Sequence, residues 1–117
     1  MIDDDKGVRD STAFLLSTLG YGCVTFAAPA AFLDACETLA PGCVLTDLRM
    51  PGMDGFELAA ALRDRGVTWP MLMMTSENGD DVGRHASNAG FLAVLRKPMD
   101  PDGLENAIAG AFEALGS

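Results

Sequence analysis

Segments with the apolar pattern of helices alternate along the chain with short apolar runs that are typical of buried strands. Apolar residues recur every three or four positions over residues 8–19, 29–39, 56–65 and 101–115, which predicts helices there. A weaker helix, with little apolar surface, is predicted over residues 82–89. Short apolar runs predict strands over residues 23–26, 43–46, 71–74 and 91–95. This alternation favours an α/β domain in which helices cover both faces of a parallel sheet.

Turn and cap residues separate these elements. Gly20 and Gly90 follow helical patterns, as a C-terminal glycine does. Asp100 before Pro101 is typical of a helix start. Residues 50–55 and 77–81 are expected to be loops, because the first segment contains Pro and Gly and the second is polar.

The start of the chain departs from the alternation. A strand should precede the helix at 8–19, but only Met1 and Ile2 come before the acidic run Asp3-Asp4-Asp5. Either the sequence begins several residues late or the first strand is vestigial, and the residues leave both alternatives open. We therefore expect a truncated or missing first strand.

Composition narrows the class of protein. A chain of 117 residues predicts one domain, over residues 1–117, that can bury a core without disulfides. The net charge of −9 disfavours nucleic acid and anionic membranes as direct partners. Three cysteines without metal-site spacing are expected to be reduced, and no apolar run reaches the roughly 20 residues that span a bilayer. With no signal-peptide pattern at the start, we expect a cytoplasmic protein without membrane contact.

Polar residues at the ends of the predicted strands are the candidates for chemistry. Asp47, Thr75 and Lys97 each follow an apolar run, and the pair Asp3-Asp4 lies near the start. The carboxyl ends of parallel strands meet at one edge of the sheet, where ligands bind. Carboxylates, a hydroxyl and an ammonium gathered there would suit a divalent metal and a phosphoryl group. Each residue taken alone has a structural reading, such as a solvated terminus, a turn cap or a surface lysine, but their joint occurrence favours a site.

Four motifs resemble the receiver domains of two-component response regulators, and most of all the FixJ branch. They are Ile2-Asp3-Asp4-Asp5, residues 44–55 with Thr46-Asp47-Leu48-Arg49-Met50-Pro51, Met74-Thr75-Ser76, and Arg96-Lys97-Pro98. They occur in order and with normal spacing over nearly the whole chain. The resemblance implies a doubly wound, flavodoxin-like fold with a five-stranded parallel sheet in the order 2-1-3-4-5.

The resemblance also implies roles for individual residues. Asp47 would accept a phosphoryl group from a sensor histidine kinase in a Mg²⁺-dependent reaction. The metal would be held by Asp4, Asp47 and the backbone carbonyl of Arg49 directly, and by Asp3 through a water. Thr75 and Lys97 would contact the phosphoryl group, and the small Ser76 would leave space beside it. Arg49 and Glu77 would tune the phosphoryl lifetime, and the peptide bond before Pro98 would be cis.

One position departs from the family pattern. The residue three positions before the lysine is usually Tyr or Phe and acts as a rotameric switch, but here it is Val94. A phosphorylation-independent interaction module therefore stands as the alternative to a phospho-accepting signalling module. A Mg²⁺-dependent aspartyl-phosphate phosphatase is disfavoured, because Arg49 stands where such enzymes carry a second catalytic Asp.

The resemblance leaves several partners open. It implies a signalling phosphoacceptor whose only reactions are autophosphotransfer and autodephosphorylation, and not a further enzyme activity. An output domain, C-terminal or separate, and a homodimer remain open, as do the cognate kinase and the regulated pathway.

Overall fold

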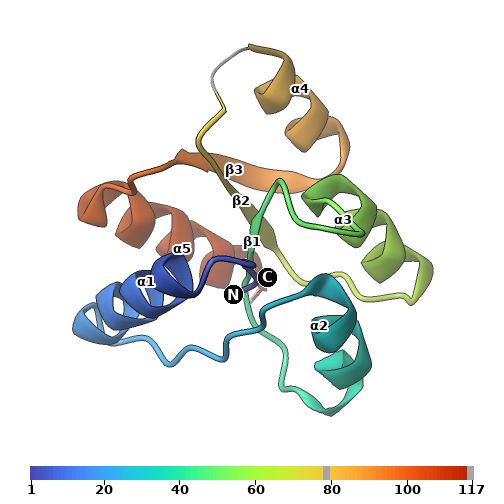
Figure 1. Cartoon of the computed structure of the whole chain (residues 1–117), viewed down its shortest axis with the longest axis horizontal. Coiled ribbons are helices and arrows are strands. Elements are labelled where there is room, and N and C mark those ends of the chain that lie inside the picture. Colours follow the sequence, from blue (N-terminus) through green and yellow to red (C-terminus); the bar gives the residue numbers. More distant parts are fainter. Residues whose placement is uncertain (78–79, 116–117) are drawn as a thin grey trace.

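A computed structural model describes residues 1–77 and 80–115. Strands and helices alternate from residue 44 onward, as the apolar pattern predicts (Figure 1). The elements in chain order are α1 (Lys6–Thr18), α2 (Pro29–Ala35), the 3₁₀ turn η1 (Cys36–Thr38), β1 (Val44–Asp47), α3 (Gly55–Asp64), β2 (Met71–Thr75), α4 (Asp80–Asn88), β3 (Phe91–Arg96) and α5 (Pro101–Leu115). Residues 78 and 79 of the predicted polar loop lie outside the described residues.

The sheet has fewer strands than predicted. Among the described residues β1, β2 and β3 form a three-stranded parallel sheet in that order, so the expected five strands are not confirmed. The strand predicted over residues 23–26 is reduced to one parallel bridge between Phe26 and Ile2, and Ile2 makes a second bridge to Thr46. The two bridges place Ile2 between Phe26 and Thr46 of β1.

Three residues at the start of the chain act as a very short central strand. Ile2 N–H donates to Leu45 O at 2.8 Å, and Asp47 N–H donates to Ile2 O at 2.9 Å. On the other side, Phe26 N–H donates to Met1 O at 2.9 Å and Asp3 N–H to Phe26 O at 3.1 Å. Where a truncated or missing first strand was expected, the structure has these four hydrogen bonds and the two bridges of Ile2.

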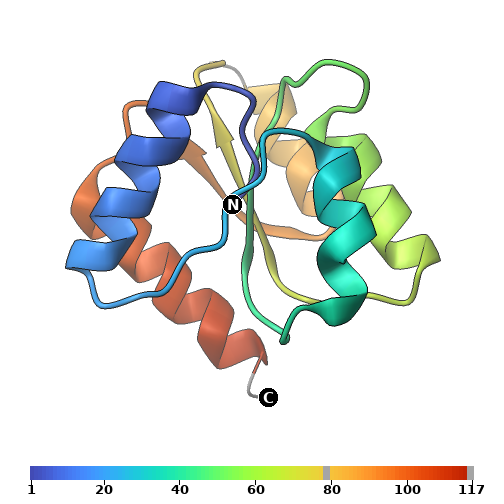
Figure 2. The same cartoon turned by 60° about the horizontal axis from the view of Figure 1, so that its bottom comes forward.

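Two hydrophobic clusters lie on opposite faces of the sheet. Side chains of α2, α3 and α4 pack on one face around Ile2 and Phe32, and those of α1 and α5 pack on the other around Leu16 and Ile108. Figure 2 shows the two groups of helices on either side of the sheet. In the part of the chain that the structure describes, no helix has the length and apolar character needed to cross a membrane.

Strand β2, the middle one of the three-stranded sheet, contains three methionines with no exposed surface, Met71, Met73 and Met74. Met71 and Met73 belong to the cluster on the α3 side, and Met74 belongs to the cluster on the α5 side. This strand therefore connects both layers of the core, and it ends at Thr75, one of the candidate site residues.

Candidate functional site

The strand ends bring the predicted site residues to one edge of the sheet. Asp47 is the last residue of β1, Thr75 the last of β2, and Lys97 follows the last residue of β3. Asp3 follows Ile2, whose bridges lie beside β1. Because parallel strands share their direction, these four side chains meet at the carboxyl edge.

Lys97 links two of the carboxylates. Its Nζ lies 3.0 Å from Asp3 Oδ2 and 3.1 Å from Asp47 Oδ1. Asp3 is completely buried, and the side chain of Lys97 is 20% exposed. The peptide bond between Lys97 and Pro98 is cis, as expected, and Lys97 N–H donates to Thr75 O at 3.0 Å. The ammonium thus neutralises a pair of acidic groups that burial would otherwise disfavour.

Three acidic residues form a group that fits a divalent cation. Asp3, Asp4 and Asp47 each offer a carboxylate oxygen within 4.8 Å of the others, and Asp4 is exposed to solvent. Oxygen ligands of this kind suit Mg²⁺, which retains several waters when it binds. The ammonium of Lys97 offsets one of the three negative charges, and the remaining negative charge of the group attracts a cation.

The site shifts the pKa values of its charged groups. Burial raises the pKa of Asp47, the hydrogen bond from Lys97 opposes that rise, and the negative charge of Asp3 adds to it. For Lys97, burial lowers the pKa, but the hydrogen bonds to Asp3 and Asp47 outweigh it and the net pKa is raised. Lys97 therefore stays charged at neutral pH, as an electrostatic partner for the acidic group.

Asp47 is held by the backbone of the following residue as well as by Lys97. Its Oδ1 accepts a hydrogen bond from Leu48 N–H at 2.9 Å. The start of α3 lies against the same residue, because a Cβ placed on Gly55 would come within 3.0 Å of Asp47 O. The sequence pattern did not identify Gly55 as a residue that packs on Asp47. The available signal was its position directly after Asp54, the residue that caps the start of α3.

An ion pair crosses the mouth of the site between two loops. Arg49 Nε lies 2.7 Å from Glu77 Oε1. Arg49 Nη1 also lies 4.0 Å from Asp54 Oδ2. The hydrogen bond to Arg49 lowers the pKa of Glu77. Glu77 N–H also donates to Thr75 Oγ1 at 3.0 Å, while Ser76 is exposed beside them. The two residues expected to tune phosphoryl lifetime are therefore in direct contact with each other.

The acidic run at the start is fixed by local contacts that sequence reasoning did not identify. Asp5 caps α1 by accepting from Val8 N–H at 3.1 Å, and Asp5 N–H donates to Asp3 Oδ1 at 2.9 Å. Arg9 donates to Asp3 O at 2.8 Å. A capping Asp at the start of a helical pattern was the signal for the first contact. The spacing of Arg9 gives no comparable signal.

Val94 lies apart from these groups. It belongs to β3, pairs in register with Met73 of β2 and packs against the cluster on the α3 side of the sheet. Its side chain is half-buried.

Comparison with known proteins gives consistent matches over most of the chain. The model of the response regulator receiver domain matches residues 1–109. The chain is similar to the transcriptional regulatory protein FixJ of Bradyrhizobium diazoefficiens, with 40% identity over 112 residues that cover 96% of this chain and 55% of that protein. It is also similar to the DNA-binding transcriptional regulator NtrC of Klebsiella pneumoniae, with 35% identity over 102 residues, 87% of this chain and 22% of that protein. The chain spans about half the length of its FixJ relatives.

Solved structures agree with these matches. Full-length FixJ from B. japonicum superposes with a TM-score of 0.89 and 39% identity, covering 96% of this chain and 55% of that one. The structure named FixJ-N has a TM-score of 0.89 and 32% identity, and the match covers 96% of this chain and 90% of that one. The Vibrio cholerae chemotaxis protein CheY4 has a TM-score of 0.86 and 26% identity, and the match covers 94% of this chain and 93% of that one.

Proposed function

Because the chain belongs to the response regulator receiver domain family and has its CheY-like fold, we propose that Asp47 accepts a phosphoryl group from a sensor histidine kinase. An oxygen of the Asp47 carboxylate would form the new P–O bond while the P–N bond of the phosphohistidine breaks. The imidazole would leave and take up a proton. The chain would then relay the aspartyl phosphate as a change of conformation, with autodephosphorylation as its only other reaction.

The observation that supports this proposal is the group of three carboxylates at the end of β1. Asp4, Asp47 and the backbone carbonyl of Arg49 would bind Mg²⁺ directly. Asp3 would act through a water, because its Oδ1 accepts from Asp5 N–H and its Oδ2 is paired with Lys97. When bound, Mg²⁺ would supply positive charge to the phosphoryl oxygens.

The other residues at the edge would recognise the phosphoryl group. Lys97 would exchange part of its interaction with Asp47 for an ion pair to a phosphoryl oxygen. The Thr75 hydroxyl would donate to another oxygen, and exposed Ser76 leaves space beside it. Glu77 N–H is bonded to Thr75 Oγ1 and the side chains of Arg49 and Glu77 are paired. This pair would influence the access of water to the phosphoryl group, and with it the phosphoryl lifetime.

Replacement of Asp47 by Asn tests the acceptor. The wild-type chain, incubated with acetyl phosphate and Mg²⁺, should gain one phosphoryl mass in intact-mass spectrometry. Asp47→Asn should gain none, because an amide is not a nucleophile toward phosphorus at neutral pH. Asp34→Asn, on the exposed face of α2, is the matched control and should be labelled like wild type. Full labelling of Asp47→Asn would contradict the assignment.

A phosphorylation-independent interaction module is the second candidate, and Val94 is the observation that favours it. A valine has no ring to change rotamer and no polar tip to bond Thr75. If beryllofluoride, with Mg²⁺, binds and leaves amide exchange unchanged throughout the chain, the second candidate is supported. Changes around Thr75 and α4 would support the first.

The partners follow from the family and from the length of the chain. We propose residues 1–117 as the receiver, with a histidine kinase as phosphodonor and an output domain, attached or separate, as the recipient of the signal. The FixJ relatives are about twice as long as the match, and their names describe transcriptional regulation. Homodimer formation on phosphorylation is tested by light scattering with and without beryllofluoride.

A further inference from the structure

Arg9 reaches back from the first turn of α1 to the acidic run that precedes this helix. Its Nη1 donates to the backbone oxygen of Asp3 at 2.8 Å, although the two residues are six positions apart along the sequence. Because a guanidinium carries a charge, this hydrogen bond is charge-assisted and stronger than one between neutral groups. The bond joins α1 to the backbone beside the three carboxylates that fit a divalent cation.

Asp4 is the proposed metal ligand whose side chain has the least support. The carboxylates of Asp3 and Asp47 both contact the ammonium of Lys97. Asp4 is exposed, and among the residues that the structure describes its carboxylate has no hydrogen bond or ion pair. The position of this carboxylate therefore depends on the backbone that carries it.

The peptide group between Asp3 and Asp4 passes the contact with Arg9 on to that backbone. A peptide group is planar and rigid, so a bond that fixes its oxygen also restricts the Cα atom that follows. Asp3 N–H donates to Phe26 O at 3.1 Å, so the Asp3 backbone is held on both sides of its own Cα atom. The Asp4 side chain therefore starts from a defined point beside the other two carboxylates.

We propose that Arg9 is a positioning residue for Mg²⁺, which holds the peptide group between Asp3 and Asp4 so that the Asp4 carboxylate meets the cation. This inference rests on the proposed function, in which Asp4 binds Mg²⁺ directly. Arg9 is not itself a ligand, because a guanidinium has no lone pair to offer a metal. Groups that orient metal ligands from behind typically contribute about 10- to 100-fold to metal affinity.

The charge of Arg9 has the opposite effect on cation binding. A guanidinium near the carboxylates repels Mg²⁺, and its removal would by itself tighten binding. Solvent screens this repulsion, because Arg9 is only half-buried and Asp4 is exposed. The positioning effect is therefore the larger of the two, and replacement of Arg9 should weaken Mg²⁺ binding.

Isothermal titration calorimetry with MgCl₂ tests the role of Arg9 without a phosphodonor. Arg9→Met keeps an unbranched stem but cannot donate a hydrogen bond, and its Kd for Mg²⁺ should be about tenfold higher than that of wild type. Arg9→Lys retains a cationic donor and should recover most of the affinity. Arg84→Met is the control for net charge, because Arg84 lies on α4 in an exposed ion pair with Asp81, and its Kd should equal that of wild type.

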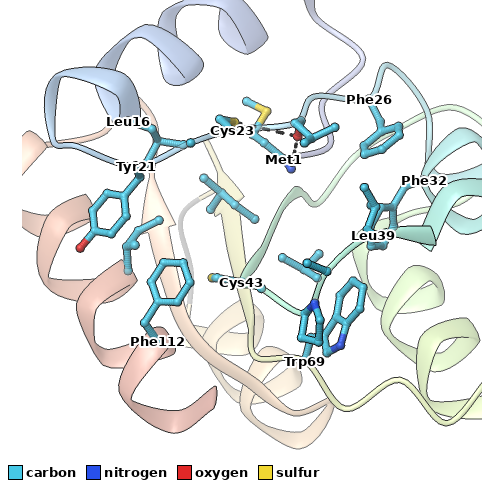
Figure 3. A pocket seen from close by; sticks show the side chains of 18 residues that line it. Met1, Leu16, Tyr21, Cys23, Phe26, Phe32, Leu39, Cys43, Trp69 and Phe112 are labelled. Atoms are coloured by element: carbon cyan, nitrogen blue, oxygen red, sulfur yellow. Dashed lines mark hydrogen bonds between the residues drawn. The ribbon is translucent and has the colours of Figure 1, made fainter. Parts of the chain in front are cut away.

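A second control separates positioning from a general loss of stability. The rings of Tyr21 and Phe112 stack with centroids 5.6 Å apart beside an apolar pocket (Figure 3). Tyr21 follows the end of α1, whereas the acidic group precedes its start. Phe112→Ala should lower the thermal midpoint and leave the Kd for Mg²⁺ unchanged, when every variant is titrated at a temperature where circular dichroism shows it to be folded. If Phe112→Ala weakens Mg²⁺ binding as much as Arg9→Met does, the proposal is wrong.

Labelling with acetyl phosphate adds a second readout. The Mg²⁺ concentration that gives half the maximal rate should rise about tenfold in Arg9→Met, with the rate at saturating Mg²⁺ within about twofold of wild type. A Kd in Arg9→Met that equals or falls below that of wild type would overturn the role of Arg9. A lower maximal rate at an unchanged half-saturating concentration would overturn it as well. If wild type is not labelled, the proposed acceptor is refuted, whereas the Kd values still decide the role of Arg9.

Discussion

Loss of the Lys97 charge should destabilise the metal-free chain more than any other single charge removal at the site. Its ammonium contacts the fully buried Asp3 and also Asp47. Lys97→Met keeps an unbranched apolar stem but leaves the two carboxylates facing each other. Removing one partner of a buried ion pair costs about 3–5 kcal/mol, and the 20% exposure of Lys97 places the expected loss near the lower end, at about 3 kcal/mol. At about 4 °C per kcal/mol, the thermal midpoint should fall by about 12 °C.

Mg²⁺ should recover much of that loss. The cation would bind the same carboxylates, and a ligand at about 100 times its Kd stabilises the folded state by about 2.7 kcal/mol. In the wild type the ammonium already compensates Asp3 and Asp47. The rise in thermal midpoint on adding Mg²⁺ should therefore be larger for Lys97→Met than for wild type.

Thermal unfolding followed by circular dichroism, in EDTA and in MgCl₂, measures both effects. Lys6→Met is the matched control, because Lys6 forms an exposed ion pair with Asp10 on α1 and its loss should change stability by about 1 kcal/mol or less. The reasoning is refuted if metal-free Lys97→Met melts together with wild type, or if Mg²⁺ raises both midpoints equally.

Three other predictions concern packing, reactivity and motion. Gly55→Ala should lower the free energy of unfolding, measured by chemical denaturation, by about 1–3 kcal/mol, because the added Cβ would press on Asp47 O. Gly83→Ala is the control: its Cβ would meet open space on α4, so the change should be neutral or stabilising. Burial raises the pKa of Cys43 from 9.0 to about 11, a difference of 2 units. Alkylation of Cys43 at pH 8 should therefore be about 100-fold slower than that of an ordinary thiol, and its rate should increase with pH up to about 11. An ordinary alkylation rate at pH 8 would contradict this. Beryllofluoride should change amide exchange mainly in α4, with a small population shift because Val94 replaces an aromatic switch; changes confined to other elements would exclude this.

Much of the site could be predicted because its residues end apolar runs. Asp47, Thr75 and Lys97 come at or directly after the ends of β1, β2 and β3, and a parallel sheet collects such positions at one edge. The structure moves each predicted strand end by one residue, so that Asp47 and Thr75 are the last residues of their strands. These shifts leave the side chains at the same edge.

The features that the sequence did not predict depend on contacts between residues that are distant along the chain. The apolar run at 23–26 has strand character, but in the part of the chain that the structure describes it forms a single bridge, from Phe26 to Ile2. The helix predicted over 29–39 ends at Ala35 and continues as a 3₁₀ turn, which keeps Cys36 buried but does not preserve the helical period. The pair Arg49–Glu77 joins two loops, and no local pattern indicates that their tips meet.

The three methionines of β2 make the folding of this chain sensitive to oxidants. While the strand is buried, its thioethers are shielded from solvent. Once the chain opens, oxidation converts a thioether into a polar sulfoxide, which does not fit a strand with apolar contacts on both faces. Each opening under oxidising conditions therefore removes a fraction of the molecules from refolding. The working lifetime of the protein in such an environment is set by the rate at which it opens and by the capacity to reduce the sulfoxides, and not by its equilibrium stability alone.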